Sequence, residues 1–302
     1  MKKGRVGNIF AFLALTILIS SPFVFAGLGD WFSGITGKAT TNATALQVTV
    51  GNTAPTVYFV NNSYPTITLS EGGAITFQIR FNASDSDGVA NLNDASASVN
   101  VTRSGSTRSN TSCVHVQDFS ANNATYECTI RLYYFDHGGA WVINASIYDV
   151  NGGNGQNTSA SFTVGELHAW QLGSSNALNW SGSLSTSDVN QGSSNDPFVL
   201  NNTGNDANLS INVTAYNLLG VTSPSYWINA SDIRVSPTIG GCSDGTLASN
   251  QTESIITGAE LDNANTVATE DIYFCIISLP STLTAQNYST SGYGNWVIET
   301  QT

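Results

Sequence analysis

The sequence predicts an all-β fold, with two tandem antiparallel β-sandwich domains that follow a signal peptide and a short linker. Beyond residue 53, short runs of alternating apolar and polar residues are separated by Gly, Asn, Asp and Pro residues, which is the pattern of strands and turns. No long run with the 3.6-residue period of an amphipathic helix occurs in that part of the chain. The four cysteines form two local pairs, one for each expected domain.

Residues 1–26 predict an export signal. A positively charged start precedes an apolar run at residues 9–19, and Val24 and Ala26 occupy the small-residue positions of a cleavage site. This predicts a mature chain that begins at Gly27, because the apolar run is short for a membrane span. We therefore expect an extracellular, cell-surface protein that has no transmembrane anchor after signal cleavage.

A second interpretation of the same segment is a pilin-like subunit. A cut between Lys3 and Gly4 would leave the apolar run on the mature protein as an N-terminal assembly helix. Arg5 and Asn8 make the start of such a helix polar, which favours the cleaved signal peptide.

Three regions are expected after the signal peptide. Residues 27–52 predict a linker, residues 53–165 an immunoglobulin-like β-sandwich, and residues 166–302 a second β-sandwich. The strands expected in the first domain are Val57–Val60, Thr66–Leu69, Ile75–Ala83, Ala95–Thr102, Cys113–Phe119, Ala124–Tyr133, Trp141–Val150 and Ala160–Val164. Those expected in the second are His168–Leu172, Leu178–Leu184, Phe198–Asn202, Ala207–Asn217, Tyr226–Ala230, Ile233–Val235, Ile272–Leu279 and Trp296–Glu299. Asp136–Trp141 and Asn202–Asp206 are expected to be turns between strands.

The composition argues against nucleic-acid binding. The net charge at pH 7 is −12, and Lys38 is the only lysine beyond the export signal. Contacts with phosphates need clustered Lys and Arg residues, and none is present. Charged residues make up only 10% of the chain, while Asn, Ser and Thr are abundant. A surface with so few charges needs another source of hydration, and N-linked glycans are one.

The glycosylation sequons support this interpretation. Fifteen N-x-S/T sites occur, against roughly seven expected by chance from the composition. Alternate side chains of a strand face opposite sides, so a sequon Asn must lie on the outward side to be modified. The predicted glycosylation sites are Asn82, Asn100, Asn144, Asn157, Asn179, Asn208, Asn212 and Asn229.

The cysteines predict disulfides. Cys113 and Cys128 are 15 residues apart, and Cys242 and Cys275 are 33 apart. An even number of cysteines in an exported chain indicates disulfides, and each could stabilise the fold by roughly 3 kcal/mol through the unfolded state. A four-cysteine zinc site is the alternative, but the sequence lacks the C-x-x-C spacing of such sites.

The acidic loop at residues 82–94 is a candidate calcium site, and it is the only cofactor site that the sequence indicates. Calcium prefers several oxygen ligands on a flexible loop. The loop lacks the ligand pattern of an EF-hand, and we favour an ordinary loop with Gly88 at positive φ. The candidate ligands are Asp85, Asp87, Asn91, Asn93 and Asp94.

The sequence predicts no enzyme and no catalytic residues. The only histidines, His115, His137 and His168, lie in different segments. None of the common hydrolase, metalloprotease or phosphate-binding motifs is present.

Five segments carry a family resemblance: Gly29–Thr40, Val48–Val57, Asp85–Ala95, Asp196–Asn205 and Tyr273–Cys275. They resemble segments of an uncharacterised group of exported archaeal cell-surface proteins. The resemblance implies an archaeal envelope and two β-sandwich domains, the first immunoglobulin-like, and it supplies no substrate and no site residues.

The expected function is that of an N-glycosylated structural or interaction protein of the cell envelope: a surface-layer, filament or cell-contact component whose partners are further copies or other envelope proteins. Ala45–Val50 is a candidate for a donated strand in such an assembly. The alternative is an adhesin module that binds glycans or proteins, with Tyr133, Tyr134, Tyr148 and Trp227 as its candidate aromatic platform.

Overall fold

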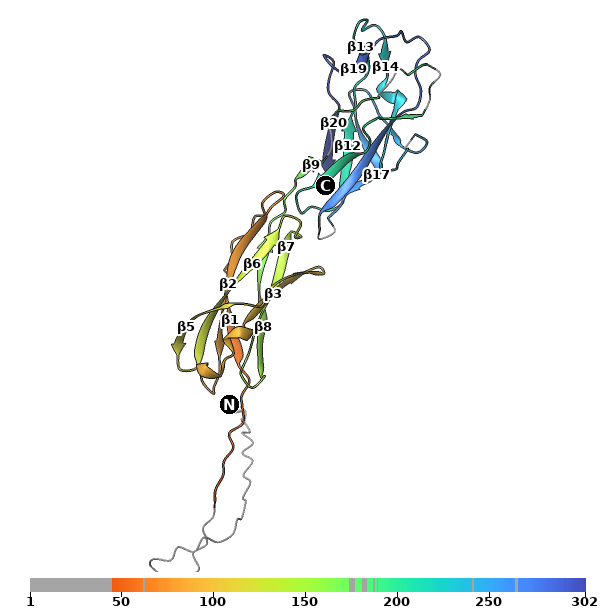
Figure 1. The fold of residues 1–302 in the computed structure, drawn as a ribbon. Coiled ribbons are helices and arrows are strands. Elements are labelled where there is room, and N and C mark those ends of the chain that lie inside the picture. Colours follow the sequence, from red (N-terminus) through yellow and green to blue (C-terminus); the bar gives the residue numbers. More distant parts are fainter. Residues whose placement is uncertain are drawn as a thin grey trace, which may run out of the picture. The chain divides into compact units, whose positions relative to one another are not determined.

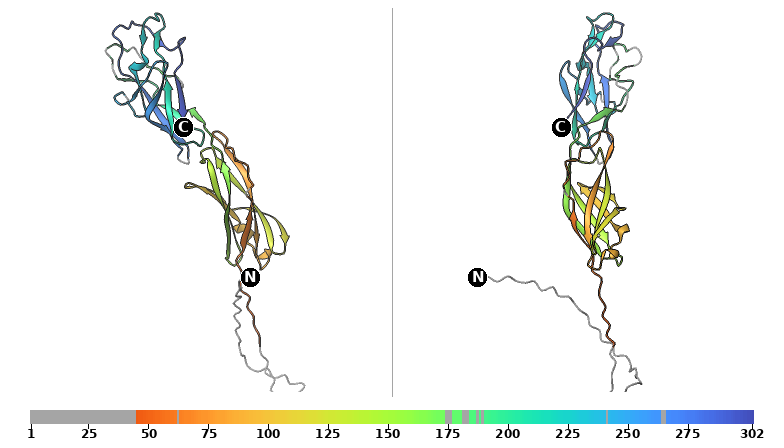
Figure 2. Two further views of the ribbon diagram at one scale, coloured as in Figure 1. Left: turned by 180° about the vertical axis from the view of Figure 1, so that it is seen from behind. Right: turned by 90° about the vertical axis from the view of Figure 1, so that its left-hand side faces the viewer.

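The computed structural model describes residues 45–302, except for residues 62, 174–176, 181–183, 187, 189, 241 and 264–265. The expected signal peptide, the alternative pilin-type cut and most of the linker lie outside the described residues. Residues 54–302 form one compact unit. As predicted, the described part of the chain is all-β, built from strands and short 3-10 helices (Figures 1 and 2). It contains no helix that is long and apolar enough to span a membrane.

Residues 56–164, orange to green in Figure 1, form two antiparallel four-stranded sheets. The first sheet has the order β1-β2-β6-β5 and the second the order β4-β3-β7-β8. Successive pairs of strands thus alternate between the sheets: β1 with β2 and β5 with β6 lie in the first, and β3 with β4 and β7 with β8 lie in the second. The bounds are β1 (Thr56–Val60), β2 (Ala74–Ser84), η1 (Val89–Asn91), η2 (Asp94–Ser96), β3 (Ser98–Arg103), β4 (Ser106–Asn110), β5 (Val114–Ser120), β6 (Asn123–Tyr133), β7 (Gly139–Tyr148) and β8 (Asn154–Val164).

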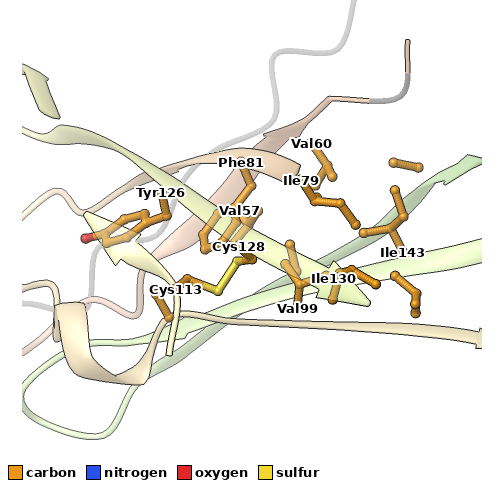
Figure 3. Close-up of a cluster of buried hydrophobic side chains, with 14 of the residues drawn as sticks. Val57, Val60, Ile79, Phe81, Val99, Cys113, Tyr126, Cys128, Ile130 and Ile143 are labelled. Atoms are coloured by element: carbon orange, nitrogen blue, oxygen red, sulfur yellow. A yellow bond between two sulfur atoms is a disulfide. The ribbon is translucent and has the colours of Figure 1, made fainter. Parts of the chain in front are cut away.

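The core of this sandwich follows from the alternation along its strands. In β6, Tyr126, Cys128 and Ile130 are buried, whereas the intervening Thr129 is exposed. Figure 3 shows these three side chains among apolar residues from the other strands, with the disulfide from Cys113 to Cys128 inside the cluster. Each sheet has one apolar face, and the two apolar faces pack against each other, which removes both from water.

Two features of the first sandwich differ from the prediction. The expected strand at Thr66–Leu69 does not form, and Ile67 makes only an isolated bridge to Val164. The short strand β4 was not predicted, because its residues are all polar and carry no alternation of apolar and polar side chains. It forms nonetheless as the second arm of a hairpin with β3.

Residues 170–301 form the second group of sheets. One has the order β16-β15-β18-β11-β9, with β10 also paired to β18; the others have the orders β17-β12-β20 and β14-β13-β19. The bounds are β9 (Trp170–Leu172), β10 (Gln191–Gly192), β11 (Phe198–Asn202), β12 (Leu209–Thr214), β13 (Leu218–Gly220), β14 (Trp227–Ile228), η3 (Ala230–Asp232), β15 (Ile233–Ser236), β16 (Thr246–Leu247), β17 (Glu253–Leu261), β18 (Ala268–Ile276), β19 (Tyr288–Ser289) and β20 (Val297–Gln301).

The second core lies mainly between β11 and β18 on one side and β12 and β17 on the other. The nine-residue strand β17 was not predicted, because the exposed Ile255 interrupts its alternation. Conversely, the described part of the expected strand Leu178–Leu184 is not a strand. Its Leu178 and Trp180 instead pack, partly buried, against the core.

The expected turn Asn202–Asp206 joins strands of two different sheets and holds the connection at residues 165–167. Asn205 is buried. Its Nδ2 donates to the carbonyl oxygens of Asp136 at 3.0 Å and Gly165 at 2.9 Å. Its Oδ1 accepts a hydrogen bond from the Leu167 backbone at 2.6 Å. One amide side chain therefore satisfies three backbone groups.

Candidate functional site

The outer face of the first sheet carries two sequons on neighbouring strands. Asn82 and Ser84 of β2 lie opposite Thr125 and Asn123 of β6. The Thr125 hydroxyl donates to Oδ1 of Asn82 over 3.0 Å. The Asn and the hydroxyl residue of a sequon are two positions apart, so a strand places both on the same face. The two sequons therefore form one cross-strand patch.

The outer face of the second sheet has the same arrangement. Asn100 of β3 lies opposite Asn144 of β7. Ser98 lies opposite Ser146, the hydroxyl residue of the Asn144 sequon, and their Oγ atoms are 2.8 Å apart. Both outer faces of the first sandwich thus present paired sequons among amide and hydroxyl side chains.

The predicted glycosylation sites differ in what their Nδ2 atoms contact. Nδ2 of Asn157 donates to the carbonyl oxygen of Val57 at 3.0 Å, which ties β8 to β1. Nδ2 of Asn229 donates to Asp232 at 3.1 Å, at the start of η3. In a further group the side chain is half-buried or exposed, and its Nδ2 donates no hydrogen bond within the described part of the chain. These residues are Asn82, Asn100, Asn144, Asn179 and Asn208.

Asn212 departs from the expected exposure. The alternation of side chains along its strand predicts that Asn212 faces outward. Its side chain is nevertheless only 1% exposed, and its Nδ2 donates to Glu253 at 2.5 Å. Asn212 lies in β12, the middle strand of the sheet β17-β12-β20. The side chain of Glu253, on the neighbouring strand β17, lies against its amide. The alternation along a strand therefore predicts on which face of the sheet a side chain lies, but not which other side chains cover that face.

The acidic loop brings some of the predicted calcium ligands together. Oδ1 of Asp85 accepts a hydrogen bond from the Asp87 backbone at 2.8 Å, and Oδ2 accepts one from Nδ2 of Asn91 at 3.2 Å. Asp94 instead accepts a hydrogen bond from the Tyr126 hydroxyl at 2.7 Å. Burial, and then this hydrogen bond, raise the pKa of Tyr126 above its ordinary value.

The remaining geometry of the loop is that of an ordinary turn. Gly88 has a φ of 105°, and the carbonyl of Asn93 accepts a hydrogen bond from Oγ of Ser96 at 2.6 Å. Among the described residues, no group of three or more His, Cys, Asp or Glu side chains is placed to hold a metal ion. Calcium binding at this loop stays a prediction.

Both predicted disulfides are confirmed. Cys113 and Cys128 have Cα atoms 4.4 Å apart, and Cys242 and Cys275 have Cα atoms 5.3 Å apart. Cys113 directly precedes β5, so its bridge ties the start of this edge strand to β6. All four cysteines are paired, which is typical of proteins that fold in an oxidising compartment.

A small pocket of about 260 Å³ lies beside the second disulfide. It is lined by Asp196, Ile239, Tyr273 and Cys275, among others. Oδ2 of Asp196 accepts a hydrogen bond from the Phe274 backbone at 2.9 Å, and Oδ1 is buried without a hydrogen-bond partner among the described residues. Burial raises the pKa of Asp196 from 3.8 to about 6, although hydrogen bonds from Phe274 and Ser193 lower it.

This pKa predicts a pH-dependent stability. The folded chain binds a proton at Asp196 that the unfolded chain has already released between pH 3.8 and about 6. Protonation of Asp196 therefore adds to the free energy of unfolding. This contribution is fully present below the pKa of Asp196 in the unfolded chain, and it is lost as the pH rises through the pKa of about 6 in the folded chain. Asp196→Asn cannot ionise and should flatten this decline in urea unfolding followed by tryptophan fluorescence. The exposed Asp244→Asn is the control, and equal slopes for Asp196→Asn and the wild type would contradict the prediction.

The edge strand β5 exposes apolar side chains. Val114, Val116 and Phe119 are all exposed, and β5 pairs only with β6 in the first sheet. Bulges interrupt the pairing of β5 with β6 next to Val116 and Phe119. Nε2 of His115 lies 2.8 Å from Oδ1 of Asp118, so the two ionisable side chains of the strand pair with each other.

The structure separates the aromatic residues that were candidates for an adhesin platform. Tyr133 and Tyr134 lie at the end of β6, where the guanidinium of Arg108 lies 5.2 Å from the centre of the Tyr133 ring. Tyr148 is at the far end of β7, and Trp227 is in β14. The four rings do not form one surface.

One histidine lies between a carboxylate and a hydroxyl. Nδ1 of His168 is 3.0 Å from Asp206, and Nε2 is 3.0 Å from the Thr300 hydroxyl. Hydrolases use this order of groups, but they also need donors for an oxyanion and a cleft for the substrate. The pocket at Asp196 does not include these residues. We assign the three residues the structural role of tying β20 to the connection before β9.

No protein-family model matches this chain, and no curated protein matches it at a significant level.

Proposed function

We propose that the chain is an exported, N-glycosylated structural or interaction protein of an archaeal cell envelope, which assembles with further copies or with other envelope proteins. The observation that carries this proposal is the pairing of sequons on both outer faces of the first sandwich. Sugars on these faces would hydrate a surface that has few charges. They would also restrict protein contacts to the edges of the sheets.

The proposed domain organisation is an immunoglobulin-like domain at residues 53–165 and a second β-sandwich at residues 166–302. The orders β1-β2-β6-β5 and β4-β3-β7-β8 support the first assignment. They correspond to the immunoglobulin arrangement with one further strand on the second sheet. Separate apolar cores in the two regions support the boundary between them.

The structure sorts the sequons, and glycopeptide mass spectrometry of the exported protein tests this sorting. In glycosylation, Nδ2 of the Asn bonds to the anomeric carbon of a lipid-linked sugar donor, loses a proton and displaces the lipid phosphate. We expect sugars at Asn82, Asn100, Asn144, Asn179 and Asn208, and unmodified side chains at Asn157, Asn212 and Asn229.

Matched variants provide the control. Thr102→Ala leaves Asn100 in place but destroys its sequon, so it should remove the same glycan mass as Asn100→Gln. Val101→Ala, inside the same sequon, should leave that mass unchanged. An unmodified protein, or a glycan at the buried Asn212, would contradict the proposal. Sedimentation and electron microscopy of the same material test whether it assembles.

A further inference from the structure

We propose that the segment Ala45–Val50 of one copy adds as a strand to the open edge of β5 in a second copy. This inference rests on the proposed function, because it names the contact through which copies assemble. It specifies both the donated segment and the strand that accepts it.

The donated segment has the pattern of a strand without a neighbour. Leu46, Val48 and Val50 alternate with polar residues, and they are 70%, 55% and 84% exposed. Within the described part of the chain, residues 45–50 pair with no strand. Alternating apolar residues are typical of a strand that buries one face. Here that face is in water, and pairing with another sheet would bury it.

The acceptor strand matches the segment in length and chemistry. β5 has seven residues, and the donated segment has six. Val114, Val116 and Phe119 are exposed along β5. An edge strand presents unpaired backbone groups, and an extended segment can add to them by hydrogen bonding while its side chains meet those of the edge.

Charge also selects this pair of surfaces. The chain has a net charge of −12, so two copies repel each other over most of their surfaces. The segment Ala45–Val50 has no charged residue, and His115 and Asp118 of β5 pair with each other. The contact therefore sets a segment without charge against a strand with a single carboxylate, so that like charges do not meet.

Several other edges are less suitable. β20 carries Glu299, and β17 carries Glu253 and Glu260. In β1, the carbonyl oxygen of Val57 already accepts a hydrogen bond from Asn157 of β8. Strands β14, β16 and β19 have only two residues each.

Cross-linking between two exported variants tests the contact. The native cysteines are all paired, so Val48→Cys and Val116→Cys each add a single free thiol. A mild oxidant that accepts the two electrons and two protons of the thiols should join the two variants in a 1:1 mixture. The control partner is Val142→Cys, because Val142 is 45% exposed and Val116 is 43% exposed. We expect at least a fivefold higher yield of the 48–116 product.

A second pair of variants tests the backbone pairing. Val48→Pro removes a backbone N–H and should abolish assembly, as measured by sedimentation, whereas Val48→Thr keeps it and should assemble. Assembly of the Val48→Pro variant to the same extent as the wild type would overturn this contact while leaving self-assembly intact. So would equal yields of the cross-links from Val48→Cys to Val116→Cys and to Val142→Cys, provided that the wild type assembles. A wild-type protein that is monomeric at all concentrations would overturn both the contact and the proposed self-assembly.

Discussion

Replacing Trp141 with alanine is expected to lower the free energy of unfolding of the first sandwich by about 3–5 kcal/mol. The indole is fully buried and stacks on Phe162, with 6.2 Å between the ring centres. Its Nε1 donates to the carbonyl oxygen of His137 at 2.9 Å. The variant would leave both a cavity and a carbonyl without its donor, so packing and hydrogen bonding are lost together.

Hydrogen exchange followed by mass spectrometry measures this loss region by region, because local opening free energies are read from each peptide. Peptides from β6 and β7 should exchange faster, while those from β12 and β18 should not change. Val142→Ala is the matched control, since Val142 is the next residue of β7 and is exposed. It should change the opening free energy by no more than about 0.5 kcal/mol. An equal effect of the two variants would show that the Trp141 contacts contribute little.

Replacing Asp136 with alanine should have an effect of similar size, about 3–5 kcal/mol. The carboxylate is buried and accepts hydrogen bonds from Nη2 of Arg108 at 2.5 Å and Nε at 3.1 Å. It also accepts one from the Tyr133 backbone at 2.8 Å. Removing it leaves a guanidinium and a backbone N–H without their acceptor, which costs more than the pair itself contributes.

Two comparisons separate the buried pair from an ordinary ion pair. Glu127→Ala breaks a pair with Arg80, whose side chain is 58% exposed, and should cost no more than about 1 kcal/mol. The double variant Asp136→Ala with Arg108→Met removes both charges and should recover part of the lost stability. Urea unfolding of the four proteins measures these differences. No recovery in the double variant would contradict the assignment of the loss to an unpaired guanidinium.

Sequence patterns predicted the long strands that have a clear alternation of apolar and polar residues, and they failed for segments that lack it or whose apolar residues pack without forming a strand. β2 and β6 were predicted nearly to their ends, because each buries one face against a core. β4 has no apolar face, and its Arg108 pairs with the distant Asp136, so its own residues carried no signal. The expected strand at Leu178–Leu184 contains apolar residues that pack against the core without pairing in a ladder.

The candidate surface shows the same limit. Outward parity identified Asn100 and Asn144 as surface residues, and both are half-buried on the outer face of their sheet. The same rule failed for Asn212, which is buried beside the side chain of Glu253 on the neighbouring strand β17. The order of strands in a sheet is a long-range property, and a single strand does not encode its neighbours.

The sequence by itself determined the all-β class, the position of strands with clear alternation such as β2 and β6, and the pairing of the cysteines, because periodicity and spacing are local properties of the chain. Only the tertiary structure decided which sequon amides remain accessible and that Asn205 is buried. It also decided which edge leaves apolar side chains in water. These properties depend on segments that lie far apart in the sequence, such as Asn205 and the carbonyl of Asp136.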